Sequence, residues 1–145
     1  MPHALYRNPA VELRPSAIHG MGVFAGQAIA AGSIIEQCHA LPLERGWERI
    51  DTVLNHYLFA WPWDGDGRAV VFGIASVFNH GRPPNAAWKT VLESNRVDFY
   101  TLCDVTAGEE LLIDYGDEYW QQAAAYSPPR GAAGRCILPI RLIEP

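Results

Sequence analysis

Asn79-His80-Gly81-Arg82-Pro83-Pro84-Asn85 is a polar segment that directly follows the apolar run 74–78. A second segment, Gly108-Glu109-Glu110-Leu111-Leu112-Ile113-Asp114-Tyr115-Gly116, combines a tight turn, a short apolar strand and a tyrosine just beyond that strand. A rigid strand can fix the direction of a side chain at its end. Tyr115 therefore stands where a functional side chain can be held in place.

These segments resemble the two signature motifs of SET-domain lysine methyltransferases, commonly written NHSxxPN and GEELxxDYG, and they occur in the family's order. Residues 18–25, with their GxG turn, resemble the family's opening strand, and residues 29–36 resemble the next one. The resemblance covers about residues 11–120. Gly81 and Arg82 replace the Ser and Cys that many relatives carry, and this departure removes a zinc ligand.

The resemblance implies a β-clip-like SET fold that is mainly β, with small sheets, short helices and a C-terminal pseudo-knot threaded beneath an earlier loop. We expect residues 1–126 to form the SET domain and residues 127–145 to form a connector and tail. The implied function is S-adenosylmethionine-dependent methylation of a lysine side chain in a protein. Two alternatives are a catalytically weakened SET fold that binds cofactor or peptide, and a β-rich interaction domain with an accidental motif match.

The chain has 145 residues, of which 49% are hydrophobic and 19% charged, so it can form one globular domain with a core. Eleven basic and sixteen acidic side chains give a formal charge of −5, without a run of Lys or Arg. This balance argues against direct nucleic-acid binding. An acidic surface favours a basic, lysine-containing protein segment as partner, although simple solubility explains the charge equally well.

No apolar stretch approaches the length of a membrane helix, and the N-terminal residues lack a signal-peptide core, so we expect a cytoplasmic protein without membrane contact. Cys38, Cys103 and Cys136 form no CxxC pair, which argues against disulfides and a zinc site. The histidines lack metal-ligand spacing, so we expect no metal. These thiols are expected to be buried or idle.

Short apolar runs bounded by Gly and Pro predict a mainly β domain. The expected strands are 11–13, 22–25, 34–38, 69–72, 97–102 and 111–113. Residues 46–58 show helical periodicity, and residues 137–143 predict a final strand. That strand could pack over the domain or pair with a second copy to form a homodimer.

The resemblance assigns Tyr115 the role of the family's catalytic tyrosine, whose hydroxyl orients the lysine amine or the transferring methyl group. The reaction needs an uncharged amine held in line with the donor, away from water. An apolar channel favours that state because desolvation lowers the pKa of lysine. A structural tyrosine that caps the core is the alternative. The residues that the resemblance assigns to cofactor binding are Gly20, Met21, Gly22, Asn79, His80, Tyr115 and Trp120.

The candidate substrate channel consists of Tyr57, Trp88 and Tyr115. Trp88 stands where some relatives place a tyrosine beside the lysine channel, and its indole would narrow that channel. It could equally be a core residue that faces away. Tyr57 precedes a variable insert that shapes the peptide groove in relatives. Trp120 is a candidate lid that covers the cofactor by packing alone, and an ordinary helix start is its alternative.

Overall fold

The computed structural model describes residues 4–44, 54, 57–62, 67–117 and 119–121. Within this part the chain is mainly β, and all six strands expected from the sequence are confirmed. The strands are β1 (Val11–Pro15), β2 (Met21–Ala25), β3 (Ile34–Pro42), β4 (Phe59–Ala60), β5 (Arg68–Phe72), β6 (Asn79–His80), β7 (Ala86–Val91), β8 (Arg96–Thr101) and β9 (Glu110–Ile113). Two 3₁₀ helices are η3 (Ile74–Val77) and η4 (Leu92–Ser94).

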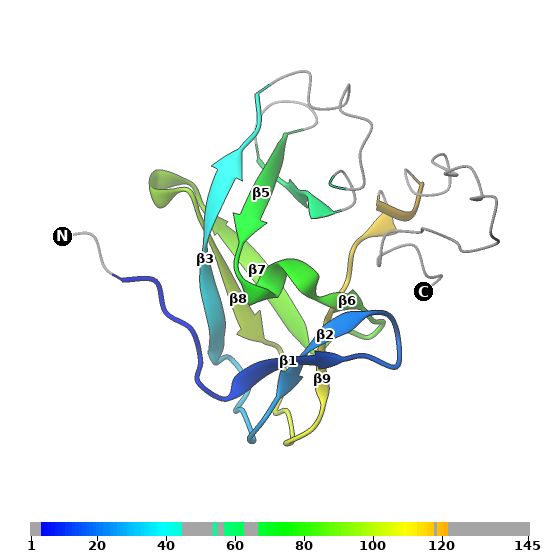
Figure 1. Ribbon diagram of the computed structural model, residues 1–145. Helices are drawn as coiled ribbons and strands as arrows, with labels where there is room; N and C mark the ends of the chain where they lie inside the picture. Colours follow the sequence, from blue (N-terminus) through cyan, green and yellow to red (C-terminus); the bar gives the residue numbers. More distant parts are fainter. Residues whose placement is uncertain (1–3, 45–53, 55–56, 63–66, 118, 122–145) are drawn as a thin grey trace.

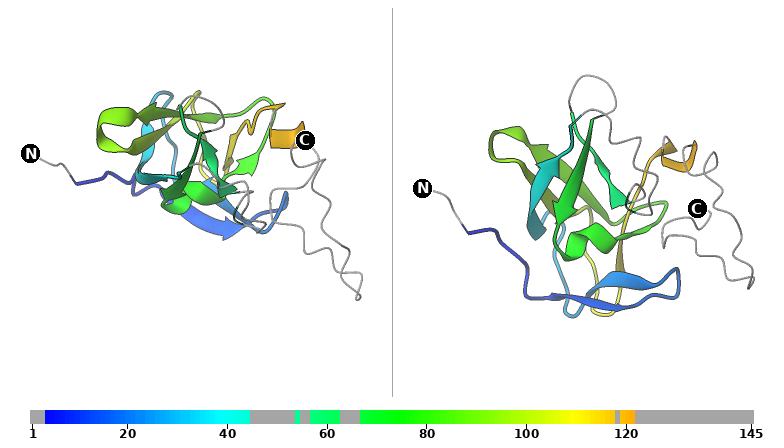
Figure 2. Two further views of the ribbon diagram at one scale, coloured as in Figure 1. Left: turned by 90° about the horizontal axis from the view of Figure 1, so that it is seen from above. Right: turned by 45° about the horizontal axis from the view of Figure 1, so that its top comes forward.

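The strands form two small sheets (Figure 1). One has five strands in the order β4-β5-β3-β8-β7, and the other has four in the order β1-β2-β9-β6. In Figures 1 and 2, β1 and β2 lie side by side, away from the β7–β8 turn. The strand that carries the second signature segment, β9, is inserted between β2 and β6, which come earlier in the chain. Its threading beneath a loop stays a prediction.

One hydrophobic core joins the two sheets. Val23 and Leu111 come from the four-stranded sheet, Ile35 and Phe99 from the five-stranded sheet, and Phe78 from the link between η3 and β6; all five are fully buried. Because Phe78 directly precedes the polar segment, the core fixes the start of that segment. The site described below therefore begins at a buried anchor.

Strand β7 was not expected from the sequence. Its residues, Ala-Ala-Trp-Lys-Thr-Val, mix two alanines with a lysine and do not show a clean alternation of apolar and polar side chains. The strand forms because it pairs along its whole length with β8, from Ala86 opposite Thr101 to Val91 opposite Arg96. The expected helix over 46–58 lies mostly outside the described residues, and the expected tail strand over 137–143 lies wholly outside them.

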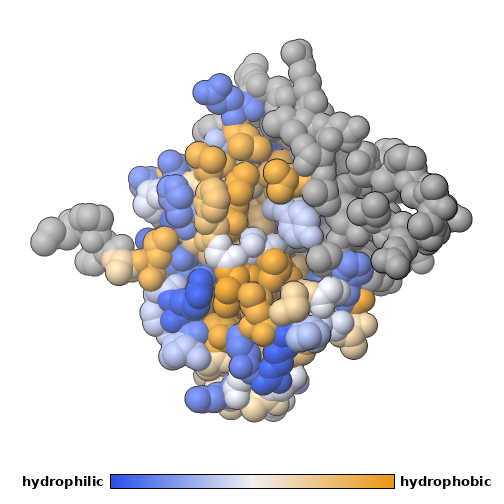
Figure 3. Space-filling model, in the orientation of Figure 1, coloured by the Kyte–Doolittle hydropathy of each residue, from blue (hydrophilic) through white to orange (hydrophobic). Residues whose placement is uncertain are grey.

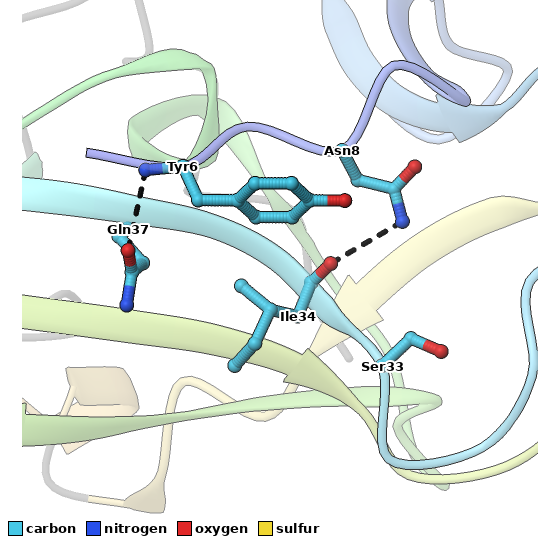
Figure 4. A pocket seen from close by; sticks show the side chains of 5 residues that line it. All are labelled: Tyr6, Asn8, Ser33, Ile34 and Gln37. Carbon is cyan, nitrogen blue, oxygen red and sulfur yellow. Dashed lines mark hydrogen bonds between the residues drawn. The ribbon is translucent and has the colours of Figure 1, made fainter. Parts of the chain in front are cut away.

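Residues 6–8 lie against β3. The guanidinium of Arg7 donates to the buried carboxylate of Glu36 at 2.8 Å, and the same carboxylate accepts the backbone N–H of Ala75 at the start of η3. A hollow of about 440 Å³ is lined by Tyr6, Asn8, Ser33, Ile34 and Gln37. Figure 4 shows the side chains of these five residues. None of the residues that line the hollow belongs to the two signature segments.

Several apolar side chains remain on the surface. In Figure 3 they gather on the face over β3 and β5, where Leu41 and Phe72 are 49% and 53% exposed. Cys38 of β3 is buried and Cys103 is exposed, and both are free thiols. Burial and the nearby Glu36 carboxylate raise the pKa of the Cys38 thiol well above its usual range. No described helix is both long and apolar enough to cross a membrane.

Candidate active site

The parallel pair β6–β9 brings the two signature segments together. Asn79 lies opposite Leu112, and His80 lies opposite Ile113. Asn85 extends the contact with its side chain, which donates to the Glu110 carbonyl at 2.9 Å and accepts the Leu112 N–H at 2.7 Å. The polar segment therefore lies along β9, and Tyr115 comes just beyond the end of that strand, beside His80.

Tyr115 is held at its backbone and at its hydroxyl. Its N–H donates to Nδ1 of His80 at 3.0 Å, and its hydroxyl donates to the Phe78 carbonyl. The ring is half-buried and packs against the core. Since Phe78 is fully buried, the hydroxyl is bonded to a carbonyl of the core. Tyr115 is therefore held by its surroundings, and its catalytic role stays a prediction.

His80 is neutral in this arrangement. Burial of the ring lowers its pKa below the ordinary value of 6.5. Because Nδ1 accepts a hydrogen bond from Tyr115, the ring proton belongs on Nε2. That Nε2 atom is buried and has no hydrogen-bond partner in the described part of the chain. The geometry leaves a donor available to a ligand.

Asn79 and Glu110 connect the site to the loop between β1 and β2. The Asn79 side-chain amide, in a residue only 2% exposed, donates to the carbonyls of His19 and Met21 and to Oε1 of Glu110, the last at 2.8 Å. The other oxygen of Glu110 accepts the Ser16 hydroxyl at 2.8 Å. That hydroxyl in turn accepts the N–H groups of Ile18 and His19. One carboxylate thus holds the loop that contains the GxG turn.

Glycine is favoured at positions 20 and 22 for different reasons. Gly20 has φ +47°, a conformation that favours glycine. Gly22 lies in β2, and a Cβ atom there would come within 2.1 Å of Oε1 of Glu110. The resemblance assigns both glycines to cofactor binding. The structure gives Gly22 a different neighbour, because its missing side chain makes room for the Glu110 carboxylate.

Two aromatic rings cover Tyr115 and His80. The Tyr119 ring lies 4.7 Å from the Tyr115 ring, and the Trp120 ring lies 6.0 Å from the Tyr115 ring and 5.1 Å from the His80 ring. Trp120 is half-buried, and its indole N–H is buried without a partner among the described residues. The two rings pack over Tyr115 and His80 from a helical segment, and the role of Trp120 as a lid over the cofactor stays a prediction.

Comparison with known proteins identifies the arrangement. Residues 20–116 match the model of the SET domain. The chain belongs to the SET-domain family. A histone-lysine N-methyltransferase of Schizosaccharomyces pombe, specific for H3 lysine-37, is 38% identical over 127 residues, which span 86% of this chain and 84% of that protein.

Solved structures agree with this membership. A Plasmodium falciparum protein assigned as a histone methyltransferase matches with a TM-score of 0.61 and 26% identity, over 78% of this chain and 98% of that one. A humanized mutant of the Chaetomium thermophilum Polycomb Repressive Complex 2 has the same TM-score and identity, over 74% of this chain but only 15% of that one. The chain is a SET-domain protein-lysine methyltransferase, and its methyl donor is S-adenosylmethionine.

The residues present fit that cofactor. Three buried polar atoms of residues in or beside the signature segments lack partners within the described residues: Nδ1 of His19, Nε2 of His80 and Nε1 of Trp120. A fourth, Nε1 of Trp61, lies beyond β4. Buried polar groups are normally paired, so such atoms indicate a missing partner. The cofactor's adenine and amino-acid groups offer acceptors and donors of the required kind.

His19 was missed as a site residue in the sequence, where it was weighed only as a metal ligand. The signal that could have found it is its position directly before Gly20, in the resemblance to the family's GxG turn. Met21, the middle residue of that turn, is 39% exposed, and its carbonyl is held by Asn79.

The candidate channel residues come from different parts of the fold. Trp88 lies on β7, Tyr57 precedes β4 and Tyr115 follows β9. Trp88 packs against the core, which is compatible with both alternatives for it. Its ring lies 5.6 Å from that of Phe59 and 6.4 Å from that of Phe99, and the residue is half-buried against the core. Tyr57 is also half-buried, shortly before β4. The place of Tyr57 and Trp88 in a lysine channel stays a prediction.

Proposed function

We propose that Tyr115 is the catalytic residue of this methyltransferase and that the substrate lysine lies in a basic, histone-like protein segment. The observation that carries the proposal is the position of Tyr115, whose backbone is tied to His80 and whose hydroxyl is tied to the buried Phe78 carbonyl. A phenol fixed at both ends can orient a substrate without losing further conformational freedom.

The cofactor site is proposed to consist of Gly20, Met21, Gly22, Asn79, His80, Tyr115 and Trp120, with His19 added from its unpartnered nitrogen. When bound, the cofactor supplies a methyl group on a positively charged sulfur. Nε2 of His80 and Nε1 of Trp120 are the donors available to it. Asn79 contributes by holding that loop, since its amide is already bonded to three acceptors.

Tyr115 is proposed to act through its oxygen. Because the hydroxyl hydrogen is directed to the Phe78 carbonyl, the oxygen would meet an amine as a hydrogen-bond acceptor. A lysine amine has an ordinary pKa of about 10.4 and must lose its proton before it can react. The aromatic rings of Tyr119 and Trp120 exclude water from this side, and desolvation favours the neutral amine.

The proposed class of substrate rests on charge and on similarity. The formal charge of −5 favours encounter with basic segments. The S. pombe relative is named for activity on H3 lysine-37, and we extend a histone-like substrate to this chain on that ground. A cytoplasmic location and a homodimer are retained as proposals from the sequence alone.

The test is incubation of the protein with labelled S-adenosylmethionine and recombinant histones, followed by identification of the labelled band and residue. Histone H3 in which lysine-37 is changed to arginine is the matched control. Labelling of a basic protein on lysine by the wild type, and its loss in Tyr115→Phe with cofactor binding retained, supports the proposal. Equal labelling by Tyr115→Phe would contradict the catalytic role, and labelling confined to acidic proteins would contradict the substrate class.

A further inference from the structure

Arg82 connects the first signature segment to both sides of the turn that carries Tyr115. Its Nε donates to Oδ2 of Asp114 at 2.9 Å, and its Nη2 donates to Oδ1 of Asp117 at 2.8 Å. The other oxygen of Asp114 accepts the Gly116 N–H at 2.8 Å. One guanidinium therefore bonds the residue before Tyr115 and the residue after Gly116.

Asp117 lies between that turn and the aromatic cover. Tyr119 and Trp120 follow it within three residues, and their rings contact those of Tyr115 and His80. A fixed Asp117 side chain therefore fixes the start of the segment that lies over the site. The rings supply the packing, and Arg82 supplies a polar bond that ties the covering segment back to the loop after His80.

The exposure of the three side chains favours this role over a contribution to stability. Arg82 is the cation that Asp114 and Asp117 share. The Arg82 hydrogen bond also holds the pKa of Asp114 below its usual value. The side chains of Arg82, Asp114 and Asp117 are 42%, 37% and 82% exposed. Exposed ion pairs contribute little to folding and weaken as salt rises.

We propose that Arg82 is a positioning residue that clasps the segment carrying Tyr119 and Trp120 over the cofactor site, and that salt loosens this clasp. The proposal rests on the proposed function, since it takes the cofactor to bind beside His80 and Trp120. Asp117 is the partner of Arg82 in the covering segment, and Asp114 is its partner in the turn that carries Tyr115. Loss of the Arg82–Asp117 bond alone should loosen the cover while Tyr115 stays in place.

The first measurement uses the cofactor-free protein. Hydrogen–deuterium exchange of the backbone amides between Gly116 and Gln121 should be faster in Arg82→Ala and in Asp117→Asn than in the wild type. Arg14→Ala is the matched control, because it removes another exposed ion pair, with Glu12 on β1. It should leave exchange in this segment unchanged. Equal exchange in Arg82→Ala and the wild type would overturn the clasp.

The second measurement is calorimetric titration with S-adenosylhomocysteine at about 50 mM and about 500 mM NaCl, a range over which screening increases strongly. At low salt, Arg82→Ala and Asp117→Asn should bind it about three- to fivefold more weakly, the size expected for loss of an exposed pair. The wild type should lose a similar factor on going to high salt, whereas Arg82→Ala should not. Arg82→Lys should restore part of the affinity.

Kinetics separate positioning from chemistry. Asp117→Asn should raise KM for the cofactor and leave kcat at saturating cofactor within about twofold, because the tyrosine turn keeps its Asp114 bond. A fall in kcat without a change in KM would overturn the assignment, as would equal cofactor affinity of the wild type and Arg82→Ala at low salt. Failure of the wild type to bind cofactor would instead contradict the proposed function, and the exchange measurement would still decide whether the clasp exists.

Discussion

Gly22→Ala is expected to destabilise the protein through Glu110 rather than through backbone strain. A Cβ atom at this position would lie 2.1 Å from Oε1 and 2.9 Å from Cδ of Glu110, so the carboxylate must move. Moving it breaks its bonds with the Asn79 amide and the Ser16 hydroxyl, both 2.8 Å long. The loop that contains Gly20 and Met21 then loses its main side-chain anchor.

The size of the effect follows from those two bonds. A hydrogen bond to a charged group contributes about 1.5–3 kcal/mol to stability, and water replaces part of this because Glu110 is only half-buried. Alanine also gains about 0.4–1 kcal/mol relative to glycine by restricting the unfolded chain. The net loss for Gly22→Ala is therefore about 1–3 kcal/mol. Glu110→Ala breaks the same bonds and should cost about the same.

The double variant distinguishes the two explanations of Gly22. In Glu110→Ala the space beside Gly22 is open except for the Phe24 ring, whose nearest carbon would be 3.1 Å from the new Cβ. Adding Gly22→Ala to it should therefore cost only a few tenths of a kcal/mol more, which gives a coupling energy of about 1–2 kcal/mol between the two positions.

The assay is urea denaturation of the four proteins of the cycle, with calorimetric titration of S-adenosylhomocysteine at each corner. All three variants should bind it more weakly than the wild type, by similar factors, because each releases the same loop. If Gly22 instead serves only to let the cofactor approach, Gly22→Ala would weaken binding without loss of stability. Additive effects in the double variant would then refute the reasoning from Glu110.

Further predictions concern three residues. Tyr115→Phe should lower kcat by about 10²- to 10³-fold, the range for loss of one positioned polar group, with cofactor affinity unchanged by calorimetry. Cofactor binding, measured against pH, should weaken only as the pH falls through the lowered pKa of His80, below its ordinary value of 6.5, because protonation of His80 removes the acceptor for the Tyr115 N–H. The lowered pKa of folded His80 also means that its contribution to stability is complete above 6.5 and falls as pH drops toward the folded pKa, which urea denaturation at several pH values would reveal. Gly73→Ala should cost about 2–4 kcal/mol in thermal unfolding, because φ is +152° there and a Cβ would lie 2.7 Å from the buried Glu36 carboxylate.

The sequence predicted the elements of the site better than their connections. Tyr115 could be placed because an apolar strand ends just before it and the surrounding motif is specific, and β9 indeed delivers it beside His80. The strands over 22–25, 34–38 and 97–102 were equally predictable, since each is a short apolar run between turn residues. These are local properties, so a local sequence pattern is sufficient to predict them.

What could not be predicted depends on partners far apart in the chain. The three acceptors of the Asn79 amide come from residues 31 to 60 positions away, and no local pattern specifies them. β7 forms because β8 pairs with it, despite weak alternation. Trp88 could be read as channel or core because its neighbours Phe59 and Phe99 are on other strands. In each case the missing information is the tertiary neighbour.

The hydrogen bonds that hold the fold together also position the site. Motif residues therefore have structural partners, and ligand binding alone does not explain why they are there. Asn79 has no amide hydrogen left for a ligand once it bonds His19, Met21 and Glu110. Nδ1 of His80 accepts the Tyr115 N–H, whereas Nε2 is buried without a partner among the described residues. A variant at Asn79 should therefore act on the cofactor through the loop, whereas a variant at His80 acts on both the cofactor and the tyrosine. His80→Asn keeps an amide oxygen that can accept the Tyr115 N–H but has no donor at the position of Nε2, so it should preserve the tyrosine turn and weaken cofactor binding in calorimetry.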